Sequence, residues 1–128
     1  MTIPSPIRRT RRDLESPVQA SILEAIATLY PCVFVHSIPN GGFILSTRAV
    51  AKLKWQGLVP GVPDLGLYWP GGGHGMIEVK AEGGRLSDDQ KAVHAILRDK
   101  GVKVAVCRGI DDLIQTMREW GVPGRVAT

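Results

Sequence analysis

The sequence predicts a single α/β domain, with a mixed central sheet and helices on its faces. Segments with apolar residues at helical spacing alternate with short apolar runs typical of strands. Clusters of glycine and proline separate these segments. The chain has 128 residues, 44% of them hydrophobic and 22% charged. That length allows one hydrophobic core and is too short for two.

The first helix is expected to begin at Ser16, after an extended, mobile arm over residues 1–13. Ser16 would be the N-cap, Pro17 the first helical residue, and Gln19 the partner that closes a capping box. The helix is expected to end before Tyr30 and Pro31. Its apolar face contains Val18, Ile22, Ala25, Ile26 and Leu29.

A strand is expected over residues 32–38, followed by a turn at 39–42. Residues 46–56 suit a short helix closed by Gly57. Two strands joined by a tight turn come next, the first containing Asp64 and the second running from Met76 to Lys80.

The next helix has a clear start signal, because Ser87 can cap it and Gln90 can complete a capping box. Its positions Val93, Ile96 and Leu97 are expected to face the core. A strand over 102–107 and a helix over 111–120 complete the order. We expect a folded domain over residues 14–122 and a short tail over 123–128.

The basic charge of the chain lies in the arm. The net charge is +4, and residues 13–128 contain twelve basic and twelve acidic side chains. The excess comes from Arg8, Arg9, Arg11 and Arg12. No apolar run approaches the ~18–20 residues that a bilayer span needs, and the start of the chain lacks an apolar signal stretch. The expected location is therefore the cytoplasm.

Asp64, Glu78 and Lys80 form the pattern with the most chemical content. Residues two apart on a strand share a face, so Glu78 and Lys80 project together while Val79 points into the core. If the two strands pair antiparallel, Asp64 comes beside Glu78. Two carboxylates repel unless a cation lies between them, and these two with the Val79 carbonyl and water suit Mg²⁺ or Mn²⁺. Such a site next to Lys80 indicates phosphodiester hydrolysis.

A simpler interpretation exists for each part. An E-x-K sequence on an edge strand is usually an exposed ion pair of little energetic value, and a Pro-Asp pair is usually a turn. The combination favours the metal site, because Pro63-Asp64 is followed by an apolar-flanked Glu78-Val79-Lys80 and then by a helix with a polar start.

The chain resembles the VRR-NUC (virus-type replication-repair nuclease) family of the PD-(D/E)xK superfamily. The resemblance covers residues 15–120 and depends on the order and spacing of several segments. They are Glu15 with Gln19, residues 36–42, residues 54–65, Glu78-Val79-Lys80, residues 83–90 and residues 101–104. It implies a restriction-endonuclease-like fold, a Mg²⁺- or Mn²⁺-dependent DNA endonuclease, and a part in replication, recombination or repair, in a bacterial or phage-infected cell.

The resemblance also implies roles for individual residues. Asp64, Glu78 and the Val79 carbonyl would hold the metal, Lys80 would act in catalysis, and Glu15 would supply a helix-borne acid. Glu24 is the rival acid, although its position away from the apolar face favours a solvated carboxylate.

Two glutamines and two other polar residues remain open at this stage. Gln19 and Gln90 either meet the site or serve only in capping boxes, and the resemblance favours a site role for Gln90. His36 and Asn40 could reach DNA or the surroundings of the metal, or His36 could be structural. His74 and His94 are expected to face solvent.

DNA is the implied partner, and the arginine arm suits it because cationic side chains follow phosphates without reading bases. Gln19, Asn40 and Lys54 are further candidate contacts, with Arg48 and Lys52 near Lys54. With few aromatic residues, we expect no stacking platform and no sequence readout. Branched, flap or junction DNA is therefore the expected substrate, bound by a homodimer.

Two other functions compete with this prediction. A DNA-binding module of the same fold would hold DNA without cleaving it, but it would be expected to lack the ligand acids. A restriction-like enzyme would share the chemistry and would need a recognition element that 128 residues barely accommodate.

Overall fold

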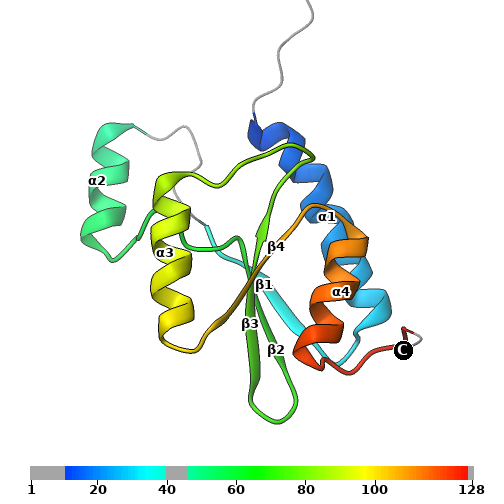
Figure 1. Ribbon diagram of the computed structural model, residues 1–128. Helices are drawn as coiled ribbons and strands as arrows, with labels where there is room; N and C mark the ends of the chain where they lie inside the picture. The colour runs from blue at the N-terminus through cyan, green and yellow to red at the C-terminus, as the bar shows by residue number, and fades with distance from the viewer. Residues whose placement is uncertain (1–10, 40–45, 127–128) are drawn as a thin grey trace, which may run out of the picture.

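The protein forms one mixed sheet with helices on both sides, as Figure 1 shows for a computed structural model. The structure describes residues 11–39 and 46–126, without the side chains of residues 11–13. The strands are β1 (Phe34–Ser37), β2 (Leu65–Trp69), β3 (Gly73–Val79) and β4 (Lys103–Cys107). The helices are α1 (Arg11–Leu29), α2 (Thr47–Trp55), α3 (Asp88–Asp99) and α4 (Ile110–Trp120).

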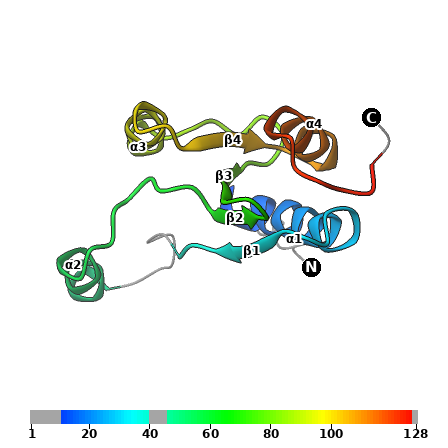
Figure 2. The same ribbon diagram turned by 90° about the horizontal axis from the view of Figure 1, so that it is seen from below.

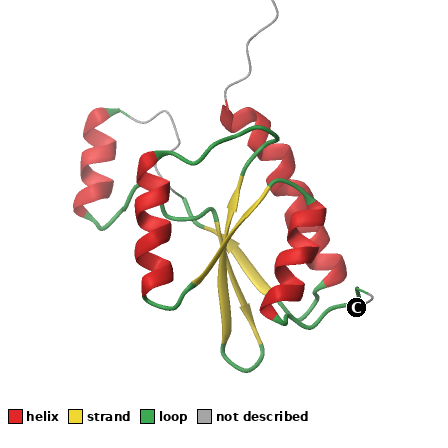
Figure 3. Cartoon of the chain, viewed as in Figure 1, coloured by secondary structure: helices red, strands yellow, loops and turns green. Residues whose placement is uncertain are grey.

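The sheet has the strand order β1-β2-β3-β4. β1 pairs with β2 and β2 with β3 antiparallel, whereas β3 and β4 are parallel and are connected through α3. Figure 2 shows α1 and α4 on one side of the sheet and α2 and α3 toward the other. This confirms the α/β prediction, and the alternation of helices and strands along the chain is visible in Figure 3.

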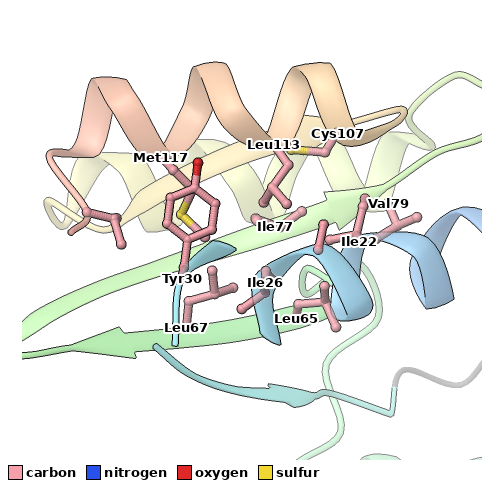
Figure 4. Close-up of a cluster of buried hydrophobic side chains, with 12 residues drawn as sticks. Ile22, Ile26, Tyr30, Leu65, Leu67, Ile77, Val79, Cys107, Leu113 and Met117 are labelled. Carbon is pink, nitrogen blue, oxygen red and sulfur yellow. The ribbon is translucent and has the colours of Figure 1, made fainter. Parts of the chain in front are cut away.

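The hydrophobic core lies between the sheet and the pair α1 and α4 (Figure 4). Alternate residues of the central strands, Leu65 and Leu67 of β2 and Ile77 and Val79 of β3, are almost fully buried there. Ile22 and Ile26 of α1 pack onto them, as the apolar spacing predicts. The opposite face of the sheet therefore carries the residues in between, including Gly66, Tyr68, His74, Met76 and Glu78.

The predicted start of the first helix is wrong. α1 already includes Arg11, so Ser16 lies inside the helix and is not its N-cap, and Pro17 is an interior residue. Arg11 and Arg12 therefore belong to a helix, whereas the expected mobile arm otherwise falls on residues 1–10, outside the described part. Residues 16–19 have the residue types of a helix start, but the helix begins further upstream. It continues through Pro17, although proline has no N–H to donate to the helix.

The later elements agree with the sequence, with one exception in α3. Ser46 caps α2, and Ser87 with Gln90 forms the predicted capping box at α3. Within α3, however, Ile96 is 55% exposed, while His94 is buried instead of facing solvent. His94 lies one turn after Gln90 on the inward stripe of the helix, and Ile96 is about 200° away from it.

Candidate active site

Asp64 lies in the loop immediately before β2, one residue outside the strand that was expected to contain it. Gly61 in that loop has φ +97°, and a Cβ there would come within 2.5 Å of the backbone oxygen of Asp89 at the start of α3. The loop is therefore packed directly against α3. Asp64 Oδ2 accepts a hydrogen bond of 2.8 Å from the Val79 N–H. This contact joins the acid to the end of β3, as the antiparallel pairing predicts.

Glu78 and Lys80 project together at the end of β3. Glu78 is fully buried and Lys80 is 3% exposed, so the exposed ion pair considered from sequence is excluded. Lys80 Nζ lies 3.7 Å from Glu78 Oε1. The Lys80 N–H donates to the Cys107 carbonyl of β4 at 3.1 Å, which fixes the backbone just beyond the strand. β3 is a central strand, and for that reason its E-x-K pair is inside the protein.

The carboxyl group of Glu78 is the most perturbed group of the site. Burial and, after it, the neighbouring Asp64 carboxylate together raise its pKa from 4.5 to about 9, and the positive charge of Lys80 opposes the shift. Both Glu78 oxygens are buried without a hydrogen-bond partner in the described part of the protein. Such an unsatisfied buried acid is costly unless a cation is bound beside it.

Glu15 reaches the same site from α1. Its Oε1 lies 3.6 Å from Lys80 Nζ and is buried. Because α1 begins before Ser16, Glu15 sits within the helix and shares the inward stripe with Ile22 and Ile26, seven and eleven residues further on. Glu24 is exposed. Of the two candidate acids, the structure therefore brings Glu15, and not Glu24, to Lys80.

The donor set fits a hard divalent cation bound largely by water. Among the described residues, no group of three or more His, Cys, Asp and Glu side chains could hold a metal. The site has instead the two adjacent acids Asp64 and Glu78 and the backbone of Val79 next to them. Mg²⁺ is commonly bound through one or two carboxylates and keeps several waters. The unpartnered oxygens of Glu78 give such an ion a place to bind.

His94 belongs to this region and was missed from sequence. It is 1% exposed, and neither ring nitrogen has a hydrogen-bond partner in the described part of the chain. Burial lowers its pKa, the positive charges of Arg98 and Lys80 lower it further, and Asp64 acts in the opposite direction. The imidazole is therefore held neutral near the site. Its spacing of four residues from Gln90 was the signal that could have placed it on the inward face.

The remaining predicted residues divide into three groups. Gln90 Oε1 accepts from the Ser87 N–H, so one of its polar atoms serves the capping box. Gln19 lies one turn after Glu15 in α1, and Lys54 is exposed on α2, which has no buried residues. The structure does not join Lys54 to the acids. Arg8, Arg9 and Asn40 lie outside the described residues.

The small number of aromatic residues did not predict that four ring side chains would gather on the sheet. Phe34, His36, Tyr68 and His74 form a continuous row of rings on the sheet, with His36 and Tyr68 stacked at 5.7 Å and Tyr68 and His74 at 5.0 Å. Composition counts only the number of aromatic residues, whereas the strand register brings these four together.

Fold and site together define the class of the protein. A mixed four-stranded sheet flanked by helices, with acids and a buried lysine at the end of the central strands, is a restriction-endonuclease-like nuclease domain. The chain belongs to the VRR-NUC family, since the VRR-NUC domain matches residues 9–111. This confirms the resemblance found in the sequence.

A curated relative agrees with this assignment. The chain is similar to a Fanconi-associated nuclease 1 homolog from Caenorhabditis elegans, with 37% identity over 78 residues. The match covers 59% of this chain and 9% of that protein, so the chain spans only a small part of the relative's length. No described helix is long and apolar enough to cross a membrane.

Proposed function

We propose that the protein is a divalent-metal-dependent DNA endonuclease that hydrolyses phosphodiester bonds at the site formed by Asp64, Glu78 and Lys80. The single observation that carries the proposal is the buried Glu78 carboxyl group, which has no hydrogen bond among the described residues and lies beside Asp64 and Lys80. Lys80 offsets part of the cost of burying this group, and a purely structural site would leave the rest without compensation.

Asp64 and Glu78, with the Val79 carbonyl, would hold Mg²⁺ or Mn²⁺. When bound, the ion would polarise a phosphoryl oxygen and acidify a water molecule. Cation binding would also favour the ionised form of Glu78, because a nearby positive charge opposes the effect of burial on its pKa.

Lys80 supplies the positive charge that faces the scissile phosphate and orients the attacking water. Glu15, 3.6 Å from Lys80 Nζ, acts as a positioning residue, because it holds the ammonium group between two acids. Gln90, at the start of α3 beside the loop that carries Asp64, is a further candidate site residue.

DNA contacts are proposed around the same end of the sheet. Arg11 and Arg12 precede Glu15 in α1, and Glu15 reaches Lys80. Arg8 and Arg9 precede them in the sequence, and Gln19, Asn40 and Lys54 are the other proposed contacts. Phosphate contacts of this kind add affinity that falls with salt.

The proposed substrate is branched, flap or junction DNA in a repair or recombination reaction. Apart from the arginines at its start, the chain has a balanced charge, and it offers little surface to grip a branched duplex. A homodimer with two-fold symmetry would bring two sites to two strands.

The test is cleavage of labelled duplex, nicked, flap and four-way-junction DNA with EDTA, Mg²⁺ or Mn²⁺. We expect metal-dependent cleavage that Asp64→Asn abolishes and that Lys80→Ala lowers by about 100-fold or more. Glu24→Gln is the matched control, since Glu24 is an exposed acid on the same helix as Glu15.

Two results would overturn the proposal. Cleavage that is unaffected by Asp64→Asn and Lys80→Ala would place the chemistry elsewhere. Tight, salt-sensitive DNA binding without cleavage under any of these metals would show instead a DNA-binding module of the same fold.

A further inference from the structure

Four ring side chains line the face of the sheet opposite the hydrophobic core. Phe34 is 67% exposed and Tyr68 is 42% exposed, although both lie in paired strands. The Phe34 and Tyr68 rings are 6.1 Å apart, and the Tyr68 ring stacks on His74 at 5.0 Å with an interplanar angle of 22°. We call Phe34, His36, Tyr68 and His74 the ring row.

The backbone holds the ring row in place. Phe34, Tyr68 and His74 are cross-strand partners in β1, β2 and β3. His36 lies opposite Gly66, and a Cβ at Gly66 would come within 2.7 Å of His36 Nε2. The missing side chain therefore lets the imidazole lie directly on the sheet, where its Nε2 is 3.2 Å from the Tyr68 hydroxyl.

The ring row leads along the sheet to the proposed catalytic acids. His74, Met76 and Glu78 alternate with the core residues of β3, so they share one face. Glu78 is four residues beyond His74, which corresponds to about 13 Å along a strand. The ring row and the proposed acids are therefore neighbours on one face of the sheet, with the buried Met76 between them.

Of the two helices toward this side of the sheet, α3 carries acidic and basic side chains, whereas the charge of α2 suits a polyanion. α2 lies toward the side of the ring row, opposite α1 and α4 (Figure 2). It carries Arg48, Lys52 and Lys54 and no acidic residue. A nucleic acid strand has the two features that match this surface, because its bases have π faces for the rings and its phosphates attract the cations.

We propose that the ring row is a stacking site for unpaired bases, which holds a single strand as it enters the catalytic site. This inference rests on the proposed nuclease function, since it takes the strand on the rings to be the substrate of the neighbouring acids. In an intact duplex the bases stack on one another, so the ring row favours substrates with an unpaired segment, such as a flap or a gap.

The experiment is binding of a fluorescent single-stranded oligonucleotide in EDTA, compared with an abasic strand of equal length. We expect the base-containing strand to bind more tightly. Phe34→Ala and Tyr68→Ala should each weaken its binding by about fivefold or more, because base–ring stacking has that magnitude. The abasic strand should be affected little. Phe34→Trp keeps a ring and should retain the affinity, whereas Phe34→Leu should not.

Ile96→Ala is the matched control, because Ile96 is an exposed apolar residue of comparable exposure on α3. Equal weakening by Ile96→Ala, equal affinity for the base-containing and abasic strands, or full affinity in Phe34→Leu would overturn the stacking site. Sedimentation of the same variants tests whether a second copy of this chain, and not a nucleic acid strand, covers the ring row. If Phe34→Ala converts a dimer to a monomer with unchanged affinity, the ring row is a subunit interface and the proposal fails.

The outcomes of this test and of the cleavage test are independent. If binding does not depend on the bases but metal-dependent cleavage is observed, the stacking site is ruled out and the nuclease function stands. Base-dependent binding through the ring row without cleavage under Mg²⁺ or Mn²⁺ would instead remove the nuclease function.

Discussion

The largest electrostatic cost of the site lies in burying the charged carboxylate of Glu78. It has no hydrogen-bond donor in the described part of the chain, its neighbour Asp64 carries like charge, and its one close cation is an ammonium 3.7 Å away. Lys80 is shared with Glu15, so its charge is divided between two acids. The metal-free protein therefore favours a protonated Glu78.

This protonation makes stability depend on pH in a defined direction. Between pH 4.5 and about 9 the unfolded chain has an ionised Glu78, whereas the folded protein keeps the proton. Unfolding then releases a proton, so stability should fall as pH rises through this window. Thermal melting in EDTA should show this slope for the natural protein and a flatter one for Glu78→Gln. Identical slopes would contradict the assignment.

His94 should produce the opposite dependence. Its pKa is lowered by burial, so the folded protein resists the proton that the unfolded chain takes up below pH 6.5. Stability should be complete above pH 6.5 and be lost as pH falls below it. His94→Leu should reduce this acid loss in urea unfolding experiments. The control is His74→Leu, which changes a ring that is not fully buried; an equal effect of both changes would argue against His94.

At the scale of elements, the loop between α2 and β2 is what aligns Asp64 with α3. Its Gly61 combines a positive φ with close contact to the backbone of Asp89. That contact cannot be relieved by a side-chain rotation. Gly57 also has a positive φ, of +105°, but a Cβ added there would meet no atom within 4 Å. Only its backbone conformation therefore favours glycine.

Gly61→Ala should therefore destabilise the protein more than Gly57→Ala. The left-handed conformation alone costs about 1–2 kcal/mol per residue, and both variants incur it. The additional loss in Gly61→Ala measures the contact with α3, and it should be accompanied by lower cleavage because Asp64 moves. Urea unfolding of both variants gives the comparison. Equal losses would mean that the loop is not held against α3.

The capping box of α3 offers a way to separate structure from chemistry at Gln90. Ser87→Ala removes the bond to the Gln90 N–H, and Gln90→Ala removes the reciprocal bond. Each should cost about 1 kcal/mol of stability. If Gln90 also serves the site, Gln90→Ala should lower cleavage at a temperature where both variants are folded, and Ser87→Ala should not.

The sequence predicts elements well where the signal is local. Ser87 with Gln90 marks a helix start correctly, and the spacing of Asp64 and Glu78 predicts their meeting across β2 and β3. The same kind of signal at Ser16 fails, because the helix continues upstream and Glu15 is thereby placed on its inward stripe. Nothing local distinguishes these two capping patterns.

At the scale of the whole molecule, the features that escape prediction come from strands far apart in sequence. The ring row needs Phe34 and Tyr68 in register, 34 residues apart. The burial of His94 needs α3 to pack across the end of the sheet that holds Lys80 and Asp64. In contrast, the balanced charge and the order of helices and strands are properties of the whole sequence. The charge is counted directly from the residues, and the observed sheet confirms the α/β prediction.

The central claim is that Asp64 and Glu78 are completed by a divalent cation. The most direct measurement is calorimetric titration of Mn²⁺ at pH 7.5 in buffers of different ionisation enthalpy, for the natural protein, Asp64→Asn and Glu24→Gln. We expect binding that releases about one proton, because Glu78 must ionise. Asp64→Asn should lose this binding, and Glu24→Gln should keep it. Binding without proton release, or binding unchanged in Asp64→Asn, would contradict the account.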